Sequence, residues 1–161
     1  MELKAGAVMS SPVICAREDM TVAELTDLLG EKQISGVPVI DADARLVGVI
    51  SITDLIALSA DHQEDTRLDE SDFYTSPAMD GLSTVGGLLE PEEELRDCQI
   101  STLMSRRVIT AVEEDPIGKL ADLMVTHRIH RLVVVRGEKI AGIVSIRDIL
   151  SALRDSYLSC S

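Results

Sequence analysis

Two polar pairs beside an apolar hairpin have the residue types that bind a phosphorylated sugar. His130 and Arg131 begin one apolar, β-branched run, and Ser145 and Asp148 follow the next one. An arginine and a helix N-terminus supply donors for a phosphate, and a carboxylate accepts hydrogen bonds from sugar hydroxyls. The spacing Ser-x-x-Asp also predicts a helix capping box. The second pair is therefore open to two interpretations, a ligand site and a helix cap.

The surrounding pattern predicts a strand, a tight turn, a second strand and a helix to position these groups. Residues 132–135 and 140–146 are apolar runs typical of strands. Gly137 lies in the polar turn between them, where it can take a positive φ. The helix is expected from residue 147 to about residue 157.

The same pattern occurs once before, about ninety-five residues earlier. Residues 33–54 match residues 129–148, and Ser51-x-x-Asp54 falls on the second Ser-x-x-Asp. In the first copy Pro38 predicts an edge position or a bulge for its strand. Each copy therefore predicts the order β-α-β-β-α.

A helix is predicted between the first and second strands of each copy. Thr21-x-x-Glu24 is a capping box that begins one helix. In the other copy Asp115 is the predicted cap and Pro116 the first helical residue. The four predicted helices cover residues 21–32, 53–59, 115–127 and 147–157.

The repeat resembles a tandem pair of cystathionine β-synthase (CBS) domains, often called a Bateman module. The motifs that carry this resemblance are residues 8–10, residues 34–41 and the two Gly-hydrophobic-x-Ser-x-x-Asp segments at 48–54 and 142–148. Residues 129–135 also look like a repeat of the γ subunit of AMP-activated protein kinase. The resemblance implies a mixed α+β fold with two repeats packed with pseudo-twofold symmetry, their sheets flanked by helices.

The domain organisation predicted from this repeat has three parts. Residues 1–60 form the first CBS domain, residues 61–97 an acidic linker and residues 98–161 the second CBS domain. The composition of the linker is typical of a flexible, disordered segment. Alternatively, Phe73 and Tyr74 pin it onto the folded repeats or a neighbouring subunit, as a docking segment or a lid. Residues 91–95 predict the start of a short helix, with a proline in its first turn.

Composition excludes several classes of partner. The net charge is −13, and residues 61–97 alone carry −10, which disfavours nucleic acid and anionic membrane surfaces. Aromatic residues make up only 2%, too few for a base-stacking platform. The sequence has neither an apolar run of about 18 residues nor a signal-peptide pattern. Three widely separated cysteines indicate a reducing compartment, so we predict a cytoplasmic protein.

The resemblance also implies which residues bind a ligand, in a cleft between the two repeats. In the second copy these are Ile109, Thr110, His130, Arg131, Leu132, Ser145, Arg147 and Asp148. In the first copy they are Ile14, Gly36, Val37, Pro38, Ser51, Thr53 and Asp54. The first copy has Ser35 and Gly36 where the second has its His-Arg pair, so we expect weaker phosphate binding and unequal occupancy.

The function implied by the resemblance is that of a non-catalytic regulatory module. It would bind AMP, ADP or ATP, with Mg²⁺ only alongside ATP, and signal to an unknown partner protein by a conformational change. A homodimer is predicted through apolar helix faces. The residues expected on those faces are Leu55, Ile56, Leu58, Ile149, Leu150 and Leu153.

Two alternatives remain open from the sequence. The pair could be a ligand-free dimerisation module in which both Ser-x-x-Asp boxes only cap helices. It could bind another adenosyl ligand, S-adenosylmethionine or NADH, although the His-Arg pair favours a phosphate. An enzyme is not predicted, because no nucleophile elbow or phosphate loop is present. His127 and His130 lack the further ligands that a metal site needs.

Overall fold

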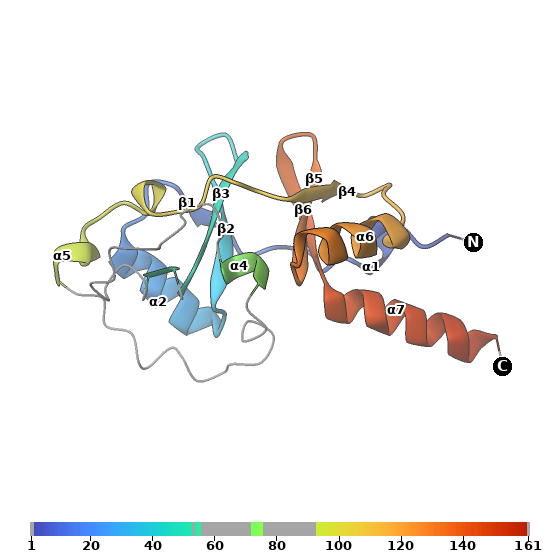
Figure 1. Ribbon diagram of the computed structural model, residues 1–161. Helices are drawn as coiled ribbons and strands as arrows, with labels where there is room; N and C mark the ends of the chain where they lie inside the picture. The colour runs from blue at the N-terminus through green and yellow to red at the C-terminus, as the bar shows by residue number, and fades with distance from the viewer. Residues whose placement is uncertain (1, 53, 56–71, 76–92, 161) are drawn as a thin grey trace. The chain divides into compact units, whose positions relative to one another are not determined.

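The computed structural model describes residues 2–52, 54–55, 72–75 and 93–160, which fold as two compact units (Figure 1). The first-repeat unit comprises residues 14–108, and the second-repeat unit comprises residues 1–13 and 109–161. Each unit holds one three-stranded sheet with helices against it. The predicted mixed α+β class is confirmed, and the second repeat has the predicted β-α-β-β-α order. Most of the final helix predicted for the first repeat, residues 53–59, lies outside the described residues. The boundaries at residues 60 and 98 stay a prediction.

The elements follow the chain in this order: α1 (Ala5–Val8), β1 (Ala16–Arg17), α2 (Val22–Lys32), β2 (Gly36–Ile40), β3 (Leu46–Ser51), α4 (Asp72–Thr75), α5 (Glu93–Arg96), η3 (Ile100–Thr102), β4 (Thr110–Val112), α6 (Ile117–His127), β5 (Arg131–Arg136), β6 (Lys139–Ser145) and α7 (Ile146–Ser159). The two sheets have the strand orders β1-β2-β3 and β4-β5-β6. In each sheet the first pair is parallel and the second is an antiparallel hairpin. Gly137 in the second hairpin has the predicted positive φ, 66°.

Helix α2 forms as its sequence predicts. The Thr21 hydroxyl accepts a hydrogen bond from Glu24 N at 3.2 Å, and the Glu24 carboxylate accepts one from Thr21 N at 3.0 Å. Two of the orphan donors at the helix start are thereby satisfied. The helix ends at Gln33 in the left-handed region, with a φ of 55°.

The predicted cap of α6 was wrong by one residue. Pro116 is the N-cap of α6, and no side chain caps this helix. Asp115 instead accepts hydrogen bonds from Val112 N at 3.0 Å and from Lys119 Nζ at 2.7 Å. These bonds, with Lys119 first, lower the pKa of the Asp115 carboxyl below its ordinary value. Asp115 therefore ties the end of β4 to the first turn of α6.

The lowered pKa of Asp115 gives the first prediction. A carboxyl whose pKa is lower in the folded state stabilises the protein above its unfolded pKa, about 3.9, and this stabilisation is lost as the pH falls through the folded value. Asp115→Asn should therefore lower stability at pH 7 and flatten the loss of stability below pH about 4. Urea unfolding from pH 3 to 7 measures both effects, with the exposed Asp122→Asn on the same α6 as control. An Asp115→Asn variant that loses stability at acidic pH as steeply as the parent would contradict this role of Asp115.

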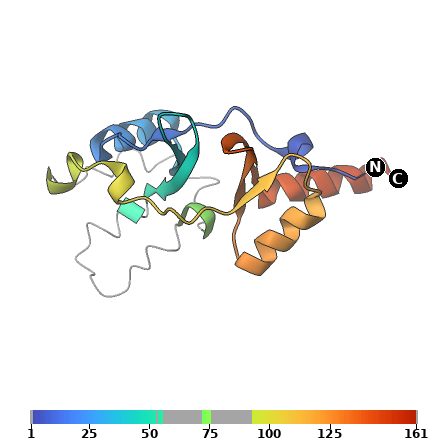
Figure 2. The same cartoon turned by 90° about the horizontal axis from the view of Figure 1, so that it is seen from above.

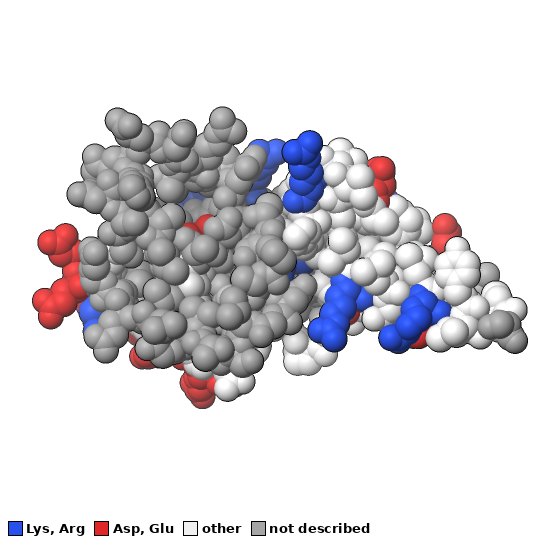
Figure 3. Space-filling view, turned by 60° about the horizontal axis from the view of Figure 1, so that its bottom comes forward, with Lys and Arg blue, Asp and Glu red and all other residues white. Residues whose placement is uncertain are grey.

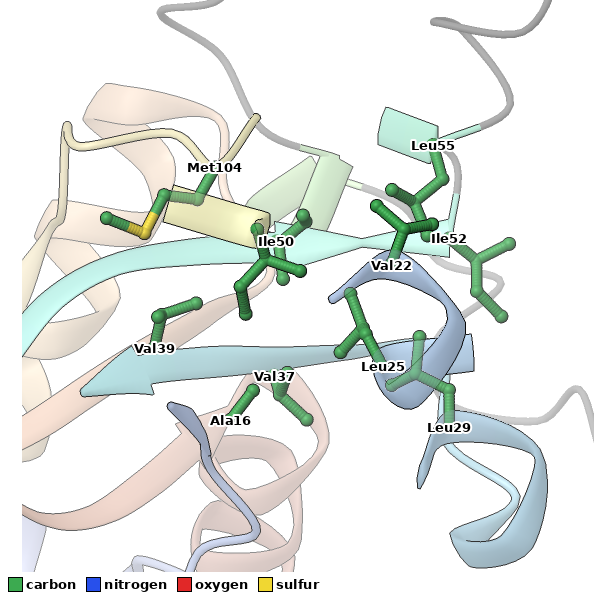
Figure 4. Close-up of a cluster of buried hydrophobic side chains, with 11 residues drawn as sticks. Ala16, Val22, Leu25, Leu29, Val37, Val39, Ile50, Ile52, Leu55 and Met104 are labelled. Atoms are coloured by element: carbon green, nitrogen blue, oxygen red, sulfur yellow. The ribbon is translucent and has the colours of Figure 1, made fainter. Parts of the chain in front are cut away.

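One face of the β2–β3 hairpin carries the core of the first-repeat unit (Figure 4). Val37, Val39 and Ile50 point to this face and pack against Leu25 and Leu29 of α2, and all five are at most 1% exposed. The burial of an aliphatic side chain of this size contributes about 1.5–3 kcal/mol. The low aromatic content therefore gives an aliphatic core, as composition indicates.

Each sheet gains an extra backbone pairing from a segment that is distant from its own hairpin. Ser105 exchanges two hydrogen bonds with Val49 of β3, each of 2.9 Å. Ser10 does the same with Ile143 of β6, at 2.8 and 3.1 Å. The N-terminal segment therefore completes the second-repeat unit, where α1 also packs against α7 (Figure 2).

The position of Pro38 differs from the prediction, because β2 is the middle strand of its sheet. Pro38 lies opposite Val49, whose N–H and C=O both bond to Ser105 instead. On its other side, the pairing with β1 begins only at Val39. A missing N–H therefore costs no ladder hydrogen bond here. The register shift of the hairpin falls one residue later, between Val39 and Ile40.

Two predictions about exposed apolar residues were wrong. Leu55 is 7% exposed and belongs to the first-repeat core, and Ile149 is 5% exposed. Leu150 and Leu153 are exposed as predicted, at 60% and 41%. Ile56 and Leu58 lie outside the described residues, as does most of the predicted linker. Within the linker, the short helix predicted near its end is observed as α5.

Candidate functional site

Strand pairing sorts the predicted ligand residues of the second repeat by sheet face. Arg131 lies opposite Ser145, and Thr110 lies opposite Val133. Paired residues share a face and faces alternate along a strand, so Thr110, Arg131 and Ser145 lie on the same face. We call these three residues the second-repeat ligand face. Leu132 lies on the opposite, core face and is fully buried, so only its backbone remains a candidate.

The end of this face is a helix N-terminus. Ser145 is the N-cap of α7, and its hydroxyl accepts a hydrogen bond from Asp148 N at 3.2 Å. Asp148 Oδ2 accepts bonds from Ser145 N at 2.7 Å and from Ser145 Oγ at 3.0 Å. The capping interpretation is thus confirmed. The cap uses only Oδ2 in these contacts, which leaves Oδ1 to accept from a sugar hydroxyl.

The start of β5 is tethered to the same helix start. Ile146 N donates a 2.8 Å hydrogen bond to the His130 carbonyl. The His130 side chain is half-buried, and Arg131 is only 8% exposed. Arg147 is exposed in the first turn of α7, and Ile109 is half-buried just before β4. The structure therefore brings a buried guanidinium, a helix N-cap and a carboxylate together at one edge of the second-repeat sheet.

The first repeat has the same backbone frame with different chemistry. Gly36 lies opposite Ser51 and Pro38 opposite Val49, and these four residues form the first-repeat ligand face. Val37 points to the core with Ile50 and offers only backbone groups.

Its helix start repeats the cap of α7. Ser51 N donates to Asp54 Oδ2 at 2.8 Å, and Asp54 N donates to Ser51 Oγ at 3.3 Å. Ile52 N donates to the Ser35 carbonyl at 2.7 Å, as Ile146 does to His130. The basic pair is missing, however, and this face therefore offers a phosphate fewer donors.

The remaining predicted ligand residues of the first repeat are Ile14 and Thr53. Ile14 is 39% exposed just before β1, and Thr53 lies outside the described residues. Cys15, which the sequence reasoning missed, aligns with Thr110 at the same ninety-five-residue offset. Burial raises the pKa of the Cys15 thiol above its ordinary value, which keeps it protonated at neutral pH. The repeat offset alone would have identified this position.

The part of the chain that the structure describes contains neither a metal-binding cluster nor a membrane-spanning helix. Among these residues no cluster of three or more His, Cys, Asp or Glu side chains is arranged to hold a metal ion. None of the helices described is both long enough and apolar enough to span a membrane.

Comparison with known proteins identifies the family. The model of the CBS domain matches residues 5–61 and residues 100–155. An uncharacterized protein of Methanocaldococcus jannaschii is 31% identical over 150 residues, which is 91% of this chain and 88% of that protein. The chain belongs to the CBS domain family and contains a tandem pair of CBS domains, as its repeat predicted.

Other similar proteins include a protein kinase subunit and two CBS proteins solved with bound ligands. The 5'-AMP-activated protein kinase subunit gamma of Dictyostelium discoideum is 29% identical over 91% of this chain, which corresponds to 23% of that subunit. The crystal structure of CBSX2 in complex with AMP has a TM-score of 0.68 at 22% identity and covers 96% of this chain and 98% of that one. The CBS domain pair of protein MJ0100, in complex with 5'-methylthioadenosine and S-adenosyl-L-methionine, has a TM-score of 0.67 at 22% identity and covers 97% and 99%. These two structures support the fold.

Proposed function

We propose that this protein is a non-catalytic regulatory module that binds an adenine nucleotide at the second-repeat ligand face and signals to a partner protein. The observation that carries the proposal is the position of Arg131, which is 8% exposed and directly opposite the N-cap Ser145 of α7. A guanidinium donates in pairs to phosphate oxygens, and a helix N-terminus adds further donors and a favourable dipole. Asp148 Oδ1 then accepts from the ribose hydroxyls.

The similar proteins support an adenosyl ligand but differ in its kind. One structural neighbour was solved with AMP, and another with 5'-methylthioadenosine and S-adenosylmethionine. The buried Arg131 favours a phosphate over a sulfonium cation, because like charges repel. We therefore propose AMP, ADP or ATP, with Mg²⁺ bound only together with ATP.

Thermal unfolding against a ligand panel tests this proposal. The panel contains AMP, ADP, ATP with and without Mg²⁺, NADH and S-adenosylmethionine. A ligand at one hundred times its dissociation constant adds about 2.7 kcal/mol to the free energy of unfolding. A rise in the unfolding midpoint with a nucleotide supports the proposal. A rise with S-adenosylmethionine alone would contradict a nucleotide ligand and identify S-adenosylmethionine instead.

Signalling requires that the nucleotide bind one conformation of the module more tightly than another. A ligand shifts a conformational equilibrium only by its difference in affinity for the two states. The tether between His130 and Ile146 links the nucleotide face to α7. We propose that the partner protein recognises the resulting change, and the cytoplasmic location stays a prediction.

We also propose a homodimer through α7. Its exposed apolar residues Ile146, Leu150, Leu153 and Tyr157 are 41%, 60%, 41% and 78% exposed and follow the 4-3-4 spacing of one helix face. In Figure 3 the right-hand part of the visible face is mostly uncharged, with scattered basic side chains and a few acidic ones. An apolar stripe of this kind is typical of an interaction surface.

Charge introduced on this stripe should dissociate the dimer. Leu150→Glu with Tyr157→Glu is expected to shift the sedimentation coefficient from dimer to monomer, because two carboxylates would be buried in an apolar contact. Ser159→Glu, on the opposite side of α7 at 100° per residue, is the matched control and should remain dimeric. A parent protein that sediments as a monomer would contradict the proposal.

The second candidate function is a ligand-free interaction module. The two capping boxes favour it, because helix capping alone accounts for both Ser-x-x-Asp pairs. A flat ligand panel measured on well-folded dimer would support this function over nucleotide binding.

A further inference from the structure

On β3 the first-repeat ligand face is more buried than the second-repeat ligand face is on β6, whereas on the neighbouring strands Gly36 is partly buried and Arg131 is buried. Val49 and Ser51 on β3 are both fully buried. The corresponding residues on β6, Ile143 and Ser145, are only partly buried. The greater burial on β3 points to a further segment that covers this part of the first-repeat ligand face.

Helix α4 is the described element that fits this requirement. This short helix packs against β3, and its two aromatic side chains are almost completely buried. Phe73 is 1% exposed and Tyr74 4% exposed, and their rings meet edge to face with centroids 5.0 Å apart. In a protein with 2% aromatic residues, these two rings supply most of the aromatic surface available for packing.

The aromatic pair does not belong to the core on the α2 side of β3. That core contains Ile50, the neighbour of Val49 on the same strand, but neither Phe73 nor Tyr74 is among its members (Figure 4). Adjacent residues on a strand point to opposite faces. A segment that packs on β3 outside the α2 core can therefore cover the face that carries Val49 and Ser51.

We propose that Phe73 and Tyr74 of α4 cover the first-repeat ligand face and close it to nucleotide. The inhibitory part of this inference rests on the proposed function, and the covering part stands without it. Helix α4 then acts as an intramolecular inhibitor of the first repeat. In the resting chain the β6 part of the second-repeat ligand face, Ile143 and Ser145, is only partly buried, and release of α4 exposes the β3 part of the first.

This covering also gives a physical reason for unequal occupancy. The first-repeat face has fewer phosphate donors and must displace two buried aromatic rings before a ligand binds. When a binding-competent state is a small fraction of the population, apparent affinity falls by that fraction. A partner protein that binds α4 would therefore raise the nucleotide affinity of the first repeat.

Cysteine labelling of the full-length chain tests the covering directly. In a background with Cys15, Cys98 and Cys160 changed to serine, Val49→Cys reports on the ligand face and Ile50→Cys on the α2 core. We expect Phe73→Ala with Tyr74→Ala to accelerate maleimide labelling of Val49→Cys about tenfold or more, as expected for loss of local protection. Labelling of Ile50→Cys should stay unchanged. An unchanged Val49→Cys rate, or an equal rise at Ile50→Cys, overturns the proposal.

A second arm tests the inhibition with AMP as the probe. By calorimetry the parent is expected to bind about one AMP per chain and the double variant about two, because the competent fraction of the first repeat rises. Accelerated Val49→Cys labelling with an unchanged stoichiometry of AMP overturns the inhibitory part. A parent that binds no nucleotide contradicts the proposed function instead, and the labelling arm still decides whether α4 covers the face.

Discussion

Replacing Gly48 with alanine is expected to lower the thermal midpoint of this protein by several degrees. An added Cβ would lie 2.7 Å from Met104 Sδ and 2.7 Å from the Ser105 carbonyl oxygen. The methionine side chain can move, but the carbonyl accepts a 2.9 Å hydrogen bond from Val49 N and holds the segment on β3. Overpacking of this kind costs about 1–3 kcal/mol. In a protein of this size each kcal/mol lowers the midpoint by about 2–4 °C.

Two other glycines are matched controls for this prediction. Gly118 is exposed in α6, and a Cβ there would meet nothing within 4 Å, so Gly118→Ala should stabilise the helix by about 0.5–1 kcal/mol. Gly142 is the counterpart of Gly48, but the three atoms nearest to its Cβ would all belong to the Met9 side chain and none to a backbone carbonyl, so Gly142→Ala should cost less than Gly48→Ala. Differential scanning calorimetry measures all three. A Gly48→Ala variant as stable as the parent would contradict the packing of Met104 and Ser105 on β3.

Replacing Arg131 with methionine is expected to weaken AMP binding about 10- to 100-fold, because hydrogen bonds between charged groups contribute about 1.5–3 kcal/mol. Methionine keeps the apolar stem of this buried side chain and removes only its donors and charge. Binding of adenosine, which lacks the phosphate, should be unchanged. Isothermal titration of both ligands separates the phosphate contribution from the rest of the site.

The control for this variant is Arg154→Met on α7. Arg154 is exposed and forms a 2.9 Å ion pair with its neighbour Asp155. Its replacement changes the net charge by the same amount as Arg131→Met does. AMP affinity should stay at the parent value. An equal loss of affinity for AMP and adenosine in Arg131→Met would contradict a phosphate role and indicate a general disturbance of the face.

Local sequence signals predicted most of each repeat. The Thr21 and Ser145 capping boxes, the Gly137 turn and the helix spacings depend on contacts within a few residues, and the structure confirms them. The face assignment of Arg131 and Ser145 also follows from strand alternation once the hairpin register is known. These features need no long-range information.

Long-range packing explains what the sequence did not reveal. Pro38 is tolerated in a middle strand because its partner Val49 bonds to Ser105, more than sixty residues away, and because the pairing with β1 begins only at Val39. Likewise, the pairing of Ser10 with Ile143 assigns the N-terminal segment to the second-repeat unit. No local pattern records which of two similar sheets a segment will join.

The two ligand faces could be predicted only in part, because the orientation of their residues also depends on long-range packing. The repeat identified the candidate residues, but the core-facing orientation of Val37 and Leu132 needed the observed register. Phe73 and Tyr74 were recognised as anchors, whereas their packing near β3 required the fold. Burial of Leu55 and Ile149 similarly depends on tertiary neighbours that helical spacing does not specify.

The measurement that tests nucleotide binding most directly is the AMP-induced rise in thermal midpoint of two aspartate variants. Asp148→Ala and Asp54→Ala each remove the acidic partner of a capping box, so both should lose a similar stability of about 0.5–2 kcal/mol without ligand. Only Asp148→Ala should lose the stabilisation by AMP, and Asp54→Ala should keep it. An Asp148→Ala protein that AMP stabilises as much as the parent would contradict nucleotide binding at the second-repeat ligand face.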